Sequence, residues 1–276
     1  MNVTDARRRR DRRRALRASL LALASTVVVF GVLAWIVVNA PGWPAVQSSF
    51  LDGQVFAAAL PGIVAAFFVN IQLFVAAEIL VLIFGLVIAI LRSVPGPVFF
   101  PVRLVATLYA DIFRALPGLL VIFVLGFGIP GLGLVDPKTP PILYGILALT
   151  LVYSAYVSEV YRAGIESVHP SQDAAARSLG LSRWQSLRHV VVPQAVRRVV
   201  PPLLNDFIGL QKDTVLVSSI GVVEIFRTAQ IKQAAAFNFT PYMAVALVFV
   251  VVTIPLARFT DVLIARDRRQ AAGGRR

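Results

Sequence analysis

Six long apolar stretches constrain this 276-residue chain more than any other feature of its sequence. A transmembrane helix needs about 20 consecutive apolar residues to cross the hydrocarbon core of a bilayer. The stretches that meet this length lie roughly at residues 18–38, 65–91, 104–128, 142–163, 203–223 and 242–264. The runs are continuous rather than alternating, which favours helices over the strands of a membrane barrel. With 58% hydrophobic and 15% charged residues, the sequence predicts an all-α, polytopic membrane protein.

The Lys and Arg residues lie in blocks that alternate from one loop to the next. Segment 1–17 holds eight Arg, loop 162–200 holds six and the end from Arg258 holds six, whereas loop 39–64 has none. Positively charged loops remain in the cytoplasm, so we expect both termini and loop 162–200 to be cytoplasmic. The net charge of +13 therefore reflects topology and does not indicate a nucleic-acid-binding surface.

The same pattern divides the chain into four parts. They are a basic cytoplasmic segment at 1–17, a transmembrane helix at 18–38, a main transmembrane domain at 65–264 with a cytoplasmic loop at 164–200, and a cytoplasmic tail at 265–276. The stretch at 18–38 follows an Arg block, as in a signal peptide, but it is longer than the 7–15 apolar residues typical of one. A retained helix is favoured, and cleavage near residues 39–41 is the alternative.

Residue types that build catalytic or metal sites are scarce. The chain has no Cys and only two His, His169 and His189, which form no convincing metal-ligand cluster. No nucleophile–base pair stands out, and the phosphate-binding pattern G-x-x-x-x-G-K-[ST] is absent. We therefore expect this chain to carry no metal, cofactor, nucleotide or catalytic site of its own.

Residues 164–200 predict two short helices joined by a sharp bend. Ser171 is the expected N-cap of the first helix, because its hydroxyl can accept a hydrogen bond from a free backbone N–H. Asp173 follows in the first turn, where a negative charge suits the helix dipole, and the run Ala174-Ala175-Ala176 has high helix propensity. Gly180 is expected to end this helix, since glycine adopts the left-handed C′ conformation without penalty.

The second helix of the loop is expected to begin at Ser182, which with Gln185 fits an S-x-x-Q capping box. Trp184, Leu187 and the valines at 190 and 191 then form an apolar stripe, and Pro193 follows near the end of the helix. Such a pair would project from the membrane as a knob. An amphipathic hairpin lying on the lipid surface is the alternative, because the Arg residues of the loop suit that as well.

The loop resembles the EAA loop of ABC-importer permeases, which reads Glu-Ala-Ala, three residues, Gly, nine residues and Ile-x-Leu-Pro. Ala175-Ala176, Gly180 and Pro193 stand at the required spacing, and valines at 190 and 192 occupy the Ile and Leu positions. The departure is Ala174, which occupies the Glu position. The ATPase contact implied by the resemblance is therefore expected to depend more on Asp173, Arg177 and the apolar face.

Further segments resemble the polar amino acid permeases of this class over about residues 65–264. The matching runs are Asp111–Pro117, Ser154–Gly164, Asn205–Ile208 and Lys212–Thr214. The resemblance implies a type I ABC-importer permease fold with a five-helix core, to which the helix at 18–38 is an addition.

By this resemblance, the chain is the permease subunit of an ATP-driven amino acid importer in the cell inner membrane. The implied partners are ABC ATPase subunits that bind the ATP, a second permease copy or paralogue, an extracytoplasmic amino acid-binding protein and the bilayer. The implied ATPase-coupling residues are Asp173, Ala174, Ala175, Ala176, Arg177, Gly180, Leu181, Trp184 and Pro193. An ATPase-independent channel or secondary transporter is the alternative, and it would need no docking knob.

Polar residues inside the predicted spans are further candidates, because ionisable groups at bilayer depth are costly and usually functional or paired. Glu78 lies mid-span with Asn70 nearer the outer end, and Lys212 and Asp213 lie mid-span in 203–223. These four residues form the candidate substrate path. Glu78 could contact the α-amino group of a passing amino acid, or Lys212 could neutralise it.

A second polar group lies near the cytoplasmic ends of its predicted helices. Its members are Asp111, Arg114, Glu159 and Arg162. Structural ion pairs are favoured over ligand contacts for this group, and their depth matches a cytoplasmic gate.

Overall fold

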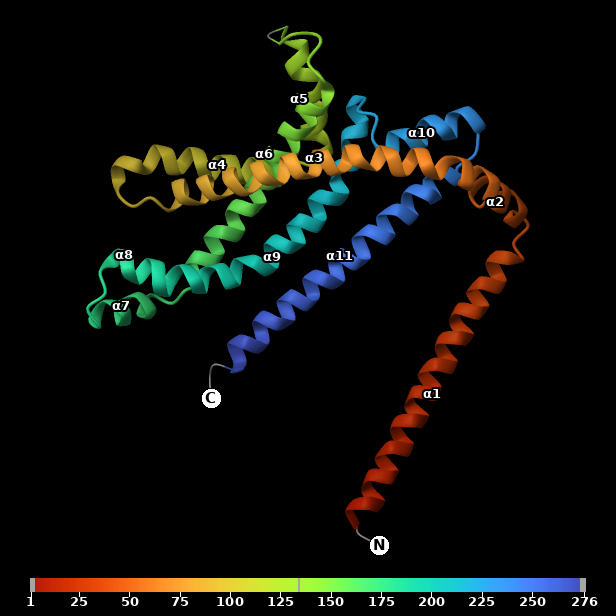
Figure 1. The fold of residues 1–276 in the computed structure, drawn as a ribbon, viewed down its shortest axis with the longest axis horizontal. Helices are drawn as coiled ribbons and strands as arrows, with labels where there is room; N and C mark the ends of the chain where they lie inside the picture. Colours follow the sequence, from red (N-terminus) through yellow and green to blue (C-terminus); the bar gives the residue numbers. More distant parts are fainter. Residues whose placement is uncertain (1–2, 134, 274–276) are drawn as a thin grey trace. The chain divides into compact units, whose positions relative to one another are not determined.

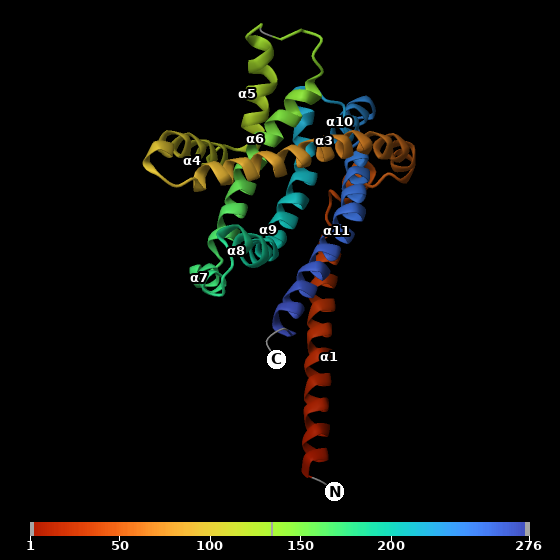
Figure 2. The same cartoon turned by 60° about the vertical axis from the view of Figure 1, so that its left-hand side comes forward.

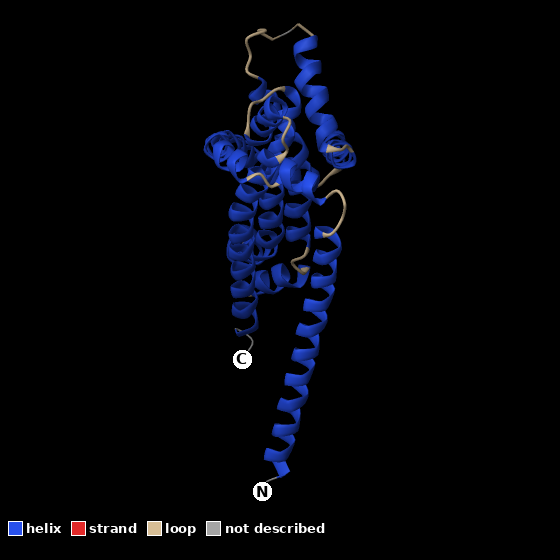
Figure 3. Cartoon of the chain, turned by 90° about the vertical axis from the view of Figure 1, so that its right-hand side faces the viewer, coloured by secondary structure: helices blue, strands red, loops and turns tan. Residues whose placement is uncertain are grey.

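The computed structural model describes residues 3–133 and 135–273, and the side-chain surroundings of residues 16–133 and 135–266. All regular structure in these residues is helical, which confirms the all-α prediction (Figures 1 and 3). The chain divides into two compact units, Met1–Asp52 and Gly53–Arg276. Residues 1–2 and 274–276 of the two predicted terminal segments lie outside the described residues.

The first unit holds two helices, α1 (Val3–Val38) and α2 (Trp43–Phe50). Segment Leu16–Val38 of α1 is long and apolar enough to cross a membrane, as expected for 18–38. The helix is longer than predicted, because it continues back through the basic segment to Val3. Arginine has a high helix propensity, so the Arg run extends the helix rather than ending it.

The second unit contains the remaining helices. They are α3 (Gly53–Ser93), η1 (Pro97–Phe99), α4 (Phe100–Ala115), α5 (Gly118–Gly131), α6 (Pro141–Glu166), α7 (Pro170–Ser178), α8 (Arg183–Ser186), η2 (Leu187–Val191), α9 (Val192–Asp213), η3 (Thr214–Ile220), α10 (Ile225–Ala236) and α11 (Thr240–Gly273). Helix α6 is central and packs against α3, α4, α5 and α9 (Figures 1 and 2).

The described residues include four helical segments that are long and apolar enough to cross a membrane, or six if each of two bent pairs counts as one crossing. The first bent pair corrects the continuous helix predicted at 104–128. Helix α4 ends at Ala115, α5 begins at Gly118, and the two meet at 106°. Leu116 is extended because it precedes Pro117, which disfavours the helical conformation of the residue before it.

The second bent pair corrects the span predicted at 203–223. Helix α9 ends at Asp213, a 3₁₀ helix follows to Ile220, and Gly221 ends it with a φ of 90°. The chain then turns by 50° into α10. Lys212 and Asp213 therefore lie at the end of the α-helical segment rather than in the middle of a continuous helix.

The boundaries of the main domain also differ from the prediction. The compact unit and α3 begin at Gly53 rather than at 65, and α11 runs through the predicted tail to Gly273. Pro61 lies inside α3. Neighbouring helices hold this early part of α3, since Ala59 and Ile63 are buried in a cluster with α10 and α11.

Close helix packing positions α6 at the centre of the fold. A Cβ atom added to Gly85 on α3 would lie 2.7 Å from Val157 Cγ1 on α6, and one added to Gly164 at the end of α6 would clash with Val199 on α9. Small residues at crossing points let membrane helices approach closely. The polar residues of α3, α6 and α9 are therefore held in fixed relation to one another.

Candidate functional site

Helices α7 and α8 form the bent pair predicted for the loop, and they lie at the end of α6 and α9 that is far from the α5–α6 connection (Figures 1 and 2). Gly180 has a φ of 89° and makes the turn. The capping box is present, because Ser182 Oγ accepts from Gln185 N and Gln185 Oε1 accepts from Ser182 N. These observations confirm the prediction of two short helices with a sharp turn between them.

The N-cap of α7 differs from the prediction. His169 caps the helix, and its Nδ1 accepts a hydrogen bond from Ser171 N at 3.2 Å. Pro170 occupies the first helical position, where its missing N–H costs nothing. Ser171 is therefore already inside the helix, and the cap falls one residue before the proline.

The residues predicted for ATPase coupling lie on different faces of the bend. Ala174, Ala175, Arg177, Gly180, Trp184 and Pro193 are exposed, Asp173 and Leu181 are half-buried, and Ala176 is buried. The tip carries two large exposed apolar side chains, Leu179 at 85% and Trp184 at 66% exposure. Apolar groups this exposed, beside Arg177 and Arg183, form a surface suited to a protein partner.

The bend joins α9 through a five-residue π-helical turn, Leu187–Val191. Pro193 follows it near the start of α9. A proline inside a helix has no backbone N–H to donate, and its ring clashes with the preceding turn. The π-helical turn is wider than an α-helical one and accommodates Pro193. Such π turns occur often at functional sites, and this one lies between the knob and the helix bundle.

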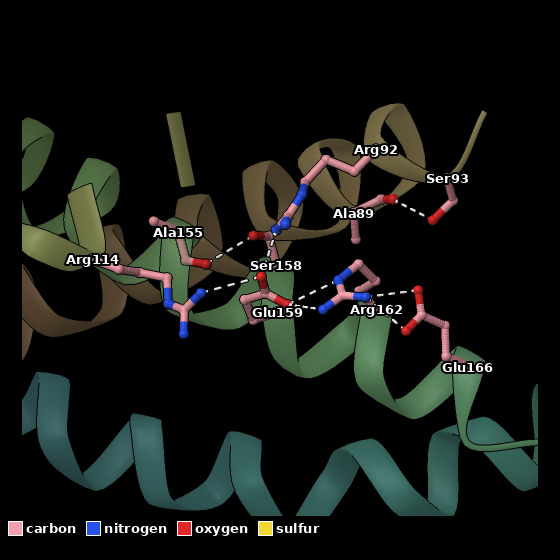
Figure 4. Close-up of polar contacts among 9 residues, drawn as sticks. All are labelled: Ala89, Arg92, Ser93, Arg114, Ala155, Ser158, Glu159, Arg162 and Glu166. Carbon is pink, nitrogen blue, oxygen red and sulfur yellow. Dashed lines mark hydrogen bonds and ion pairs between the residues drawn. The ribbon is translucent and has the colours of Figure 1, made fainter. Parts of the chain in front are cut away.

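Glu159 on α6 is the centre of an ion-pair cluster (Figure 4). Its Oε1 lies 2.9 Å from Arg92 Nη1 on α3 and 3.1 Å from Arg114 Nη1 on α4, and its Oε2 lies 2.8 Å from Arg162 Nη2. Arg162 also pairs with Glu166 at 2.7 Å. The cluster joins three helices at the end of α6 that leads into the knob.

This cluster contains three of the four residues predicted at this depth. Arg114, Glu159 and Arg162 come together, whereas Asp111 is exposed and takes no part in the ion pairs around Glu159. Arg92 was not predicted as a member, although the sequence marks it as a charge at the end of an apolar stretch. The gate role of the cluster remains a prediction.

Asn70 lies in a buried hydrogen-bond network rather than on an open surface. Its Nδ2 donates to Thr214 Oγ1 at 3.0 Å and to Glu224 Oε2 at 2.8 Å, and its Oδ1 accepts from Ile225 N at 3.0 Å. Glu224 is fully buried and caps α10 by accepting from Arg227 N at 2.8 Å. Sequence reasoning missed Glu224, although a single carboxylate in the apolar run 222–226 could have revealed it.

The other three predicted path residues lie apart from this network. Glu78 on α3 is half-buried, and the neighbouring charge that acts on it is the carboxylate of Asp206 on α9. Asp213 Oδ2 accepts from Tyr153 OH at 2.8 Å. Lys212, the suggested neutralising partner of Glu78, is exposed.

Asp206 is a further residue that sequence reasoning did not single out for the path. Its Oδ2 is buried and accepts no hydrogen bond from the described part of the chain. Two neighbouring carboxylates with a buried, unpartnered oxygen form a place where a positive group would be stabilised. Helices α3 and α9 carry the two carboxylates, and both residues are half-buried.

Comparisons with known proteins agree with this architecture. Residues 82–269 match the family "Binding-protein-dependent transport system inner membrane component". The chain is 34% identical over 207 residues to "Probable amino-acid permease protein YxeN" of Bacillus subtilis, covering 74% of this chain and 90% of that protein.

Solved structures share the fold. One is an amino acid ABC transporter crystallised with histidines, with 30% identity and a TM-score of 0.71 over 78% of this chain and 98% of that one. The other is an inward-facing MetNI methionine ABC transporter, with 15% identity and a TM-score of 0.59 over 74% of this chain and 95% of that one. The second likeness concerns the fold alone.

Proposed function

Because the chain belongs to the family of inner membrane components of binding-protein-dependent transport systems, we propose that it is the permease subunit of an ATP-driven importer of polar amino acids. The amino acid class is supported by the relative described as an amino-acid permease and by the similar amino acid transporter structure. The observation that carries the proposal is the α7–α8 knob with its exposed apolar tip, since a channel or secondary transporter has no use for such a docking element.

The partners follow from this role. An ABC ATPase subunit docks on the knob, binds the ATP and hydrolyses it, while this chain holds no nucleotide or other cofactor. A second permease copy or paralogue completes the membrane path, and an extracytoplasmic binding protein delivers the amino acid. Arg177 and Arg183, beside Leu179 and Trp184, favour an ATPase groove with an apolar floor and acidic rim.

The orientation that suits this role places the knob and both termini in the cytoplasm. The Arg-rich segments 1–17 and 162–200 support it through the positive-inside rule. The α5–α6 and α10–α11 connections, which carry few Lys or Arg residues, then face the outside. The knob and the receiving surface for the binding protein lie at opposite ends of α6.

The proposed substrate path uses the polar residues inside the bundle. Glu78 and Asp206 are suited to the α-ammonium group of an amino acid, because a cation between two carboxylates relieves their repulsion. Asp213, Lys212 and Asn70 complete the set expected from the sequence. Asn70 contributes by holding Glu224 and the start of α10 in place.

The mechanism is a rigid-body change driven through the knob. ATP binding closes the ATPases and pulls the two knobs of the permease pair together, and α6 and α9 transmit the movement to the bundle. The ion pairs of Glu159 join α3, α4 and α6 at the cytoplasmic end. While they are intact they hold this end of the path closed, and their separation lets it open. Hydrolysis then resets the complex.

The proposal is tested by reconstituting this chain with its ATPase and binding protein in proteoliposomes. We expect labelled polar amino acids to enter only with ATP, and an ATPase variant that cannot hydrolyse ATP to abolish uptake. Removal of residues 171–191 is expected to abolish ATPase co-purification. Uptake or ion current in the absence of any ATPase would contradict the proposal and support a channel or secondary transporter.

A further inference from the structure

One side-chain contact ties the two helices of the knob together. Ser186 Oγ, in the last turn of α8, donates to Asp173 Oδ1, in the first turn of α7, at 2.6 Å. Ser186 is fully buried and Asp173 is half-buried. A hydrogen bond to a carboxylate is stronger than one between neutral groups, and shielding from water strengthens it further.

We propose that the Asp173–Ser186 hydrogen bond positions the knob, because it sets the angle between α7 and α8 at which the exposed tip meets the ATPase. This inference rests on the proposed function, which makes the knob the contact with the ATPase. Asp173 and Ser186 are positioning residues in this role, and they act through the surface formed by Leu179 and Trp184.

The turn between the helices needs such a constraint. It passes through Gly180, which has a φ of 89°. Glycine has no Cβ, so its backbone adopts positive and negative φ with similar ease. The backbone bonds of the turn, Gly180 N to Arg177 O and Leu181 N to Ala176 O, end α7. The Ser182–Gln185 box starts α8. These bonds are local to one helix end, so they define where each helix stops and not how the two are angled.

The other polar link between the knob and its surroundings is weaker. Gln194 Nε2 on α9 donates to Gln172 Oε1 on α7 at 3.4 Å, between exposed groups. This link is longer and open to water, which makes it easily exchanged for bonds to solvent. It also holds α7 to α9 rather than α7 to α8.

The contact also assigns a role to Asp173 that differs from a direct ATPase contact. One of its oxygens is engaged with Ser186, and the carboxylate lies in the first turn of α7, where the helix dipole stabilises it. The side chain therefore serves the interior of the knob. The exposed face that remains for the ATPase is formed by Leu179, Trp184 and Arg177.

The experiment uses the full complex of permease, ATPase and binding protein, with four single variants of the permease. In Ser186→Ala and Asp173→Ala the bond is lost. In Asp173→Asn an amide oxygen still accepts from Ser186. Ser178→Ala is the matched control, because Ser178 is exposed and bonds only within its own helix, to Ala175 O at 2.8 Å.

The measurements are ATPase co-purification, basal ATP hydrolysis, and amino acid taken up per ATP hydrolysed. Ser186→Ala is expected to keep co-purification and basal hydrolysis within about twofold. Uptake per ATP is expected to fall about tenfold in both Ser186→Ala and Asp173→Ala, the effect of losing one charge-assisted bond. In Asp173→Asn and Ser178→Ala, uptake per ATP is expected to stay within about twofold of that of the parent protein. The double variant Asp173→Ala/Ser186→Ala is expected to lose no more than either single variant.

Three results would overturn the inference. They are unchanged uptake per ATP in Ser186→Ala, a loss in Asp173→Asn equal to that in Asp173→Ala, or additive losses in the double variant. Absence of ATP-driven uptake in the parent complex is a different result, because it contradicts the proposed function itself.

A cross-linked variant keeps the inference testable if Ser186→Ala does not assemble. The chain has no Cys, so Asp173→Cys/Ser186→Cys can be joined specifically by a short bifunctional thiol reagent, with a cysteine-free ATPase as partner. Cross-linking is expected to raise uptake per ATP about tenfold over the uncross-linked protein. A cross-linked protein that stays uncoupled would show that the α7–α8 angle does not control coupling.

Discussion

Arg92 Nη1 on α3 lies 2.9 Å from Glu159 Oε1 on α6, and the Arg92 side chain is only 9% exposed. An ion pair with so little access to water is screened weakly by salt. The loss of Glu159 would leave the Arg92 charge uncompensated, which costs more than an exposed pair contributes. This pair therefore fixes the central helix of the bundle to α3 at the end where the knob begins.

Glu159→Gln is expected to lower the free energy of unfolding by about 2 kcal/mol, because it removes the negative charge that pairs with three Arg side chains at once. Thermal unfolding of the purified protein in detergent measures this. Glu166→Gln is the matched control, since Glu166 is 60% exposed and pairs with Arg162 within the same helix; its effect is expected to be about 0.5 kcal/mol or less. Equal effects of the two variants would show that the cluster does not hold the helices.

Asn70→Ala is expected to destabilise the protein by about 1–3 kcal/mol, because it leaves the buried Glu224 and Ile225 N–H without their partner. Asn70→Asp is expected to be worse, since it places a second carboxylate beside Glu224. Gln72→Ala is the control, because Gln72 is exposed two residues further along α3. The same unfolding measurement applies, and a stable Asn70→Ala with reduced uptake would instead assign Asn70 to the substrate path.

Glu78→Gln is expected to reduce amino acid uptake by about tenfold while ATPase assembly stays intact. The physical reason is the loss of a negative charge that stabilises the α-ammonium group of the substrate, with an effect comparable to one charged hydrogen bond. Uptake kinetics in proteoliposomes measure the expected loss of transport, and co-purification of the ATPase measures whether assembly is intact. Normal uptake in the variant would remove Glu78 from the path.

Trp184→Ala is expected to weaken ATPase binding by about thirtyfold, the loss typical of an aromatic residue at the centre of an interface. The variant should unfold at the same temperature as the parent, since Trp184 is 66% exposed. Phe237→Ala provides a control at the other end of the bundle, because Phe237 is 87% exposed but lies after α10. Binding of purified ATPase to each variant in nanodiscs gives the comparison, and an unchanged affinity for Trp184→Ala would exclude the tip as the contact.

Local sequence patterns predicted the helices well where one physical rule dominated. The capping box of Ser182 and Gln185 and the turn at Gly180 were correct, because cap geometry involves residues three or four apart. Pro117 shows the opposite case. Its effect on Leu116 breaks the predicted span at 104–128 into α4 and α5, and the strong hydropathy of the surrounding residues concealed it.

The sequence predicted which types of residue form the candidate site, but it predicted less well which of these residues contact one another. Glu159, Arg114 and Arg162 were expected to lie at one depth, and they meet. Asp111 was placed with them by hydropathy, yet it is exposed. Depth in a membrane follows from sequence position, whereas the direction in which a side chain faces depends on how its helix is rotated against its neighbours.

The sequence by itself determined that this chain crosses a membrane as helices and carries a bent helix pair in an Arg-rich loop. Apolar length sets the first property, because backbone groups in lipid must bond within the helix, and local caps set the second. Only the tertiary structure decided that Asn70 meets Glu224, that Asp206 is within electrostatic reach of Glu78, and that Ser186 holds Asp173. The first of these pairs is 154 residues apart in the chain, so only the packing of helices onto one another brings the two side chains together.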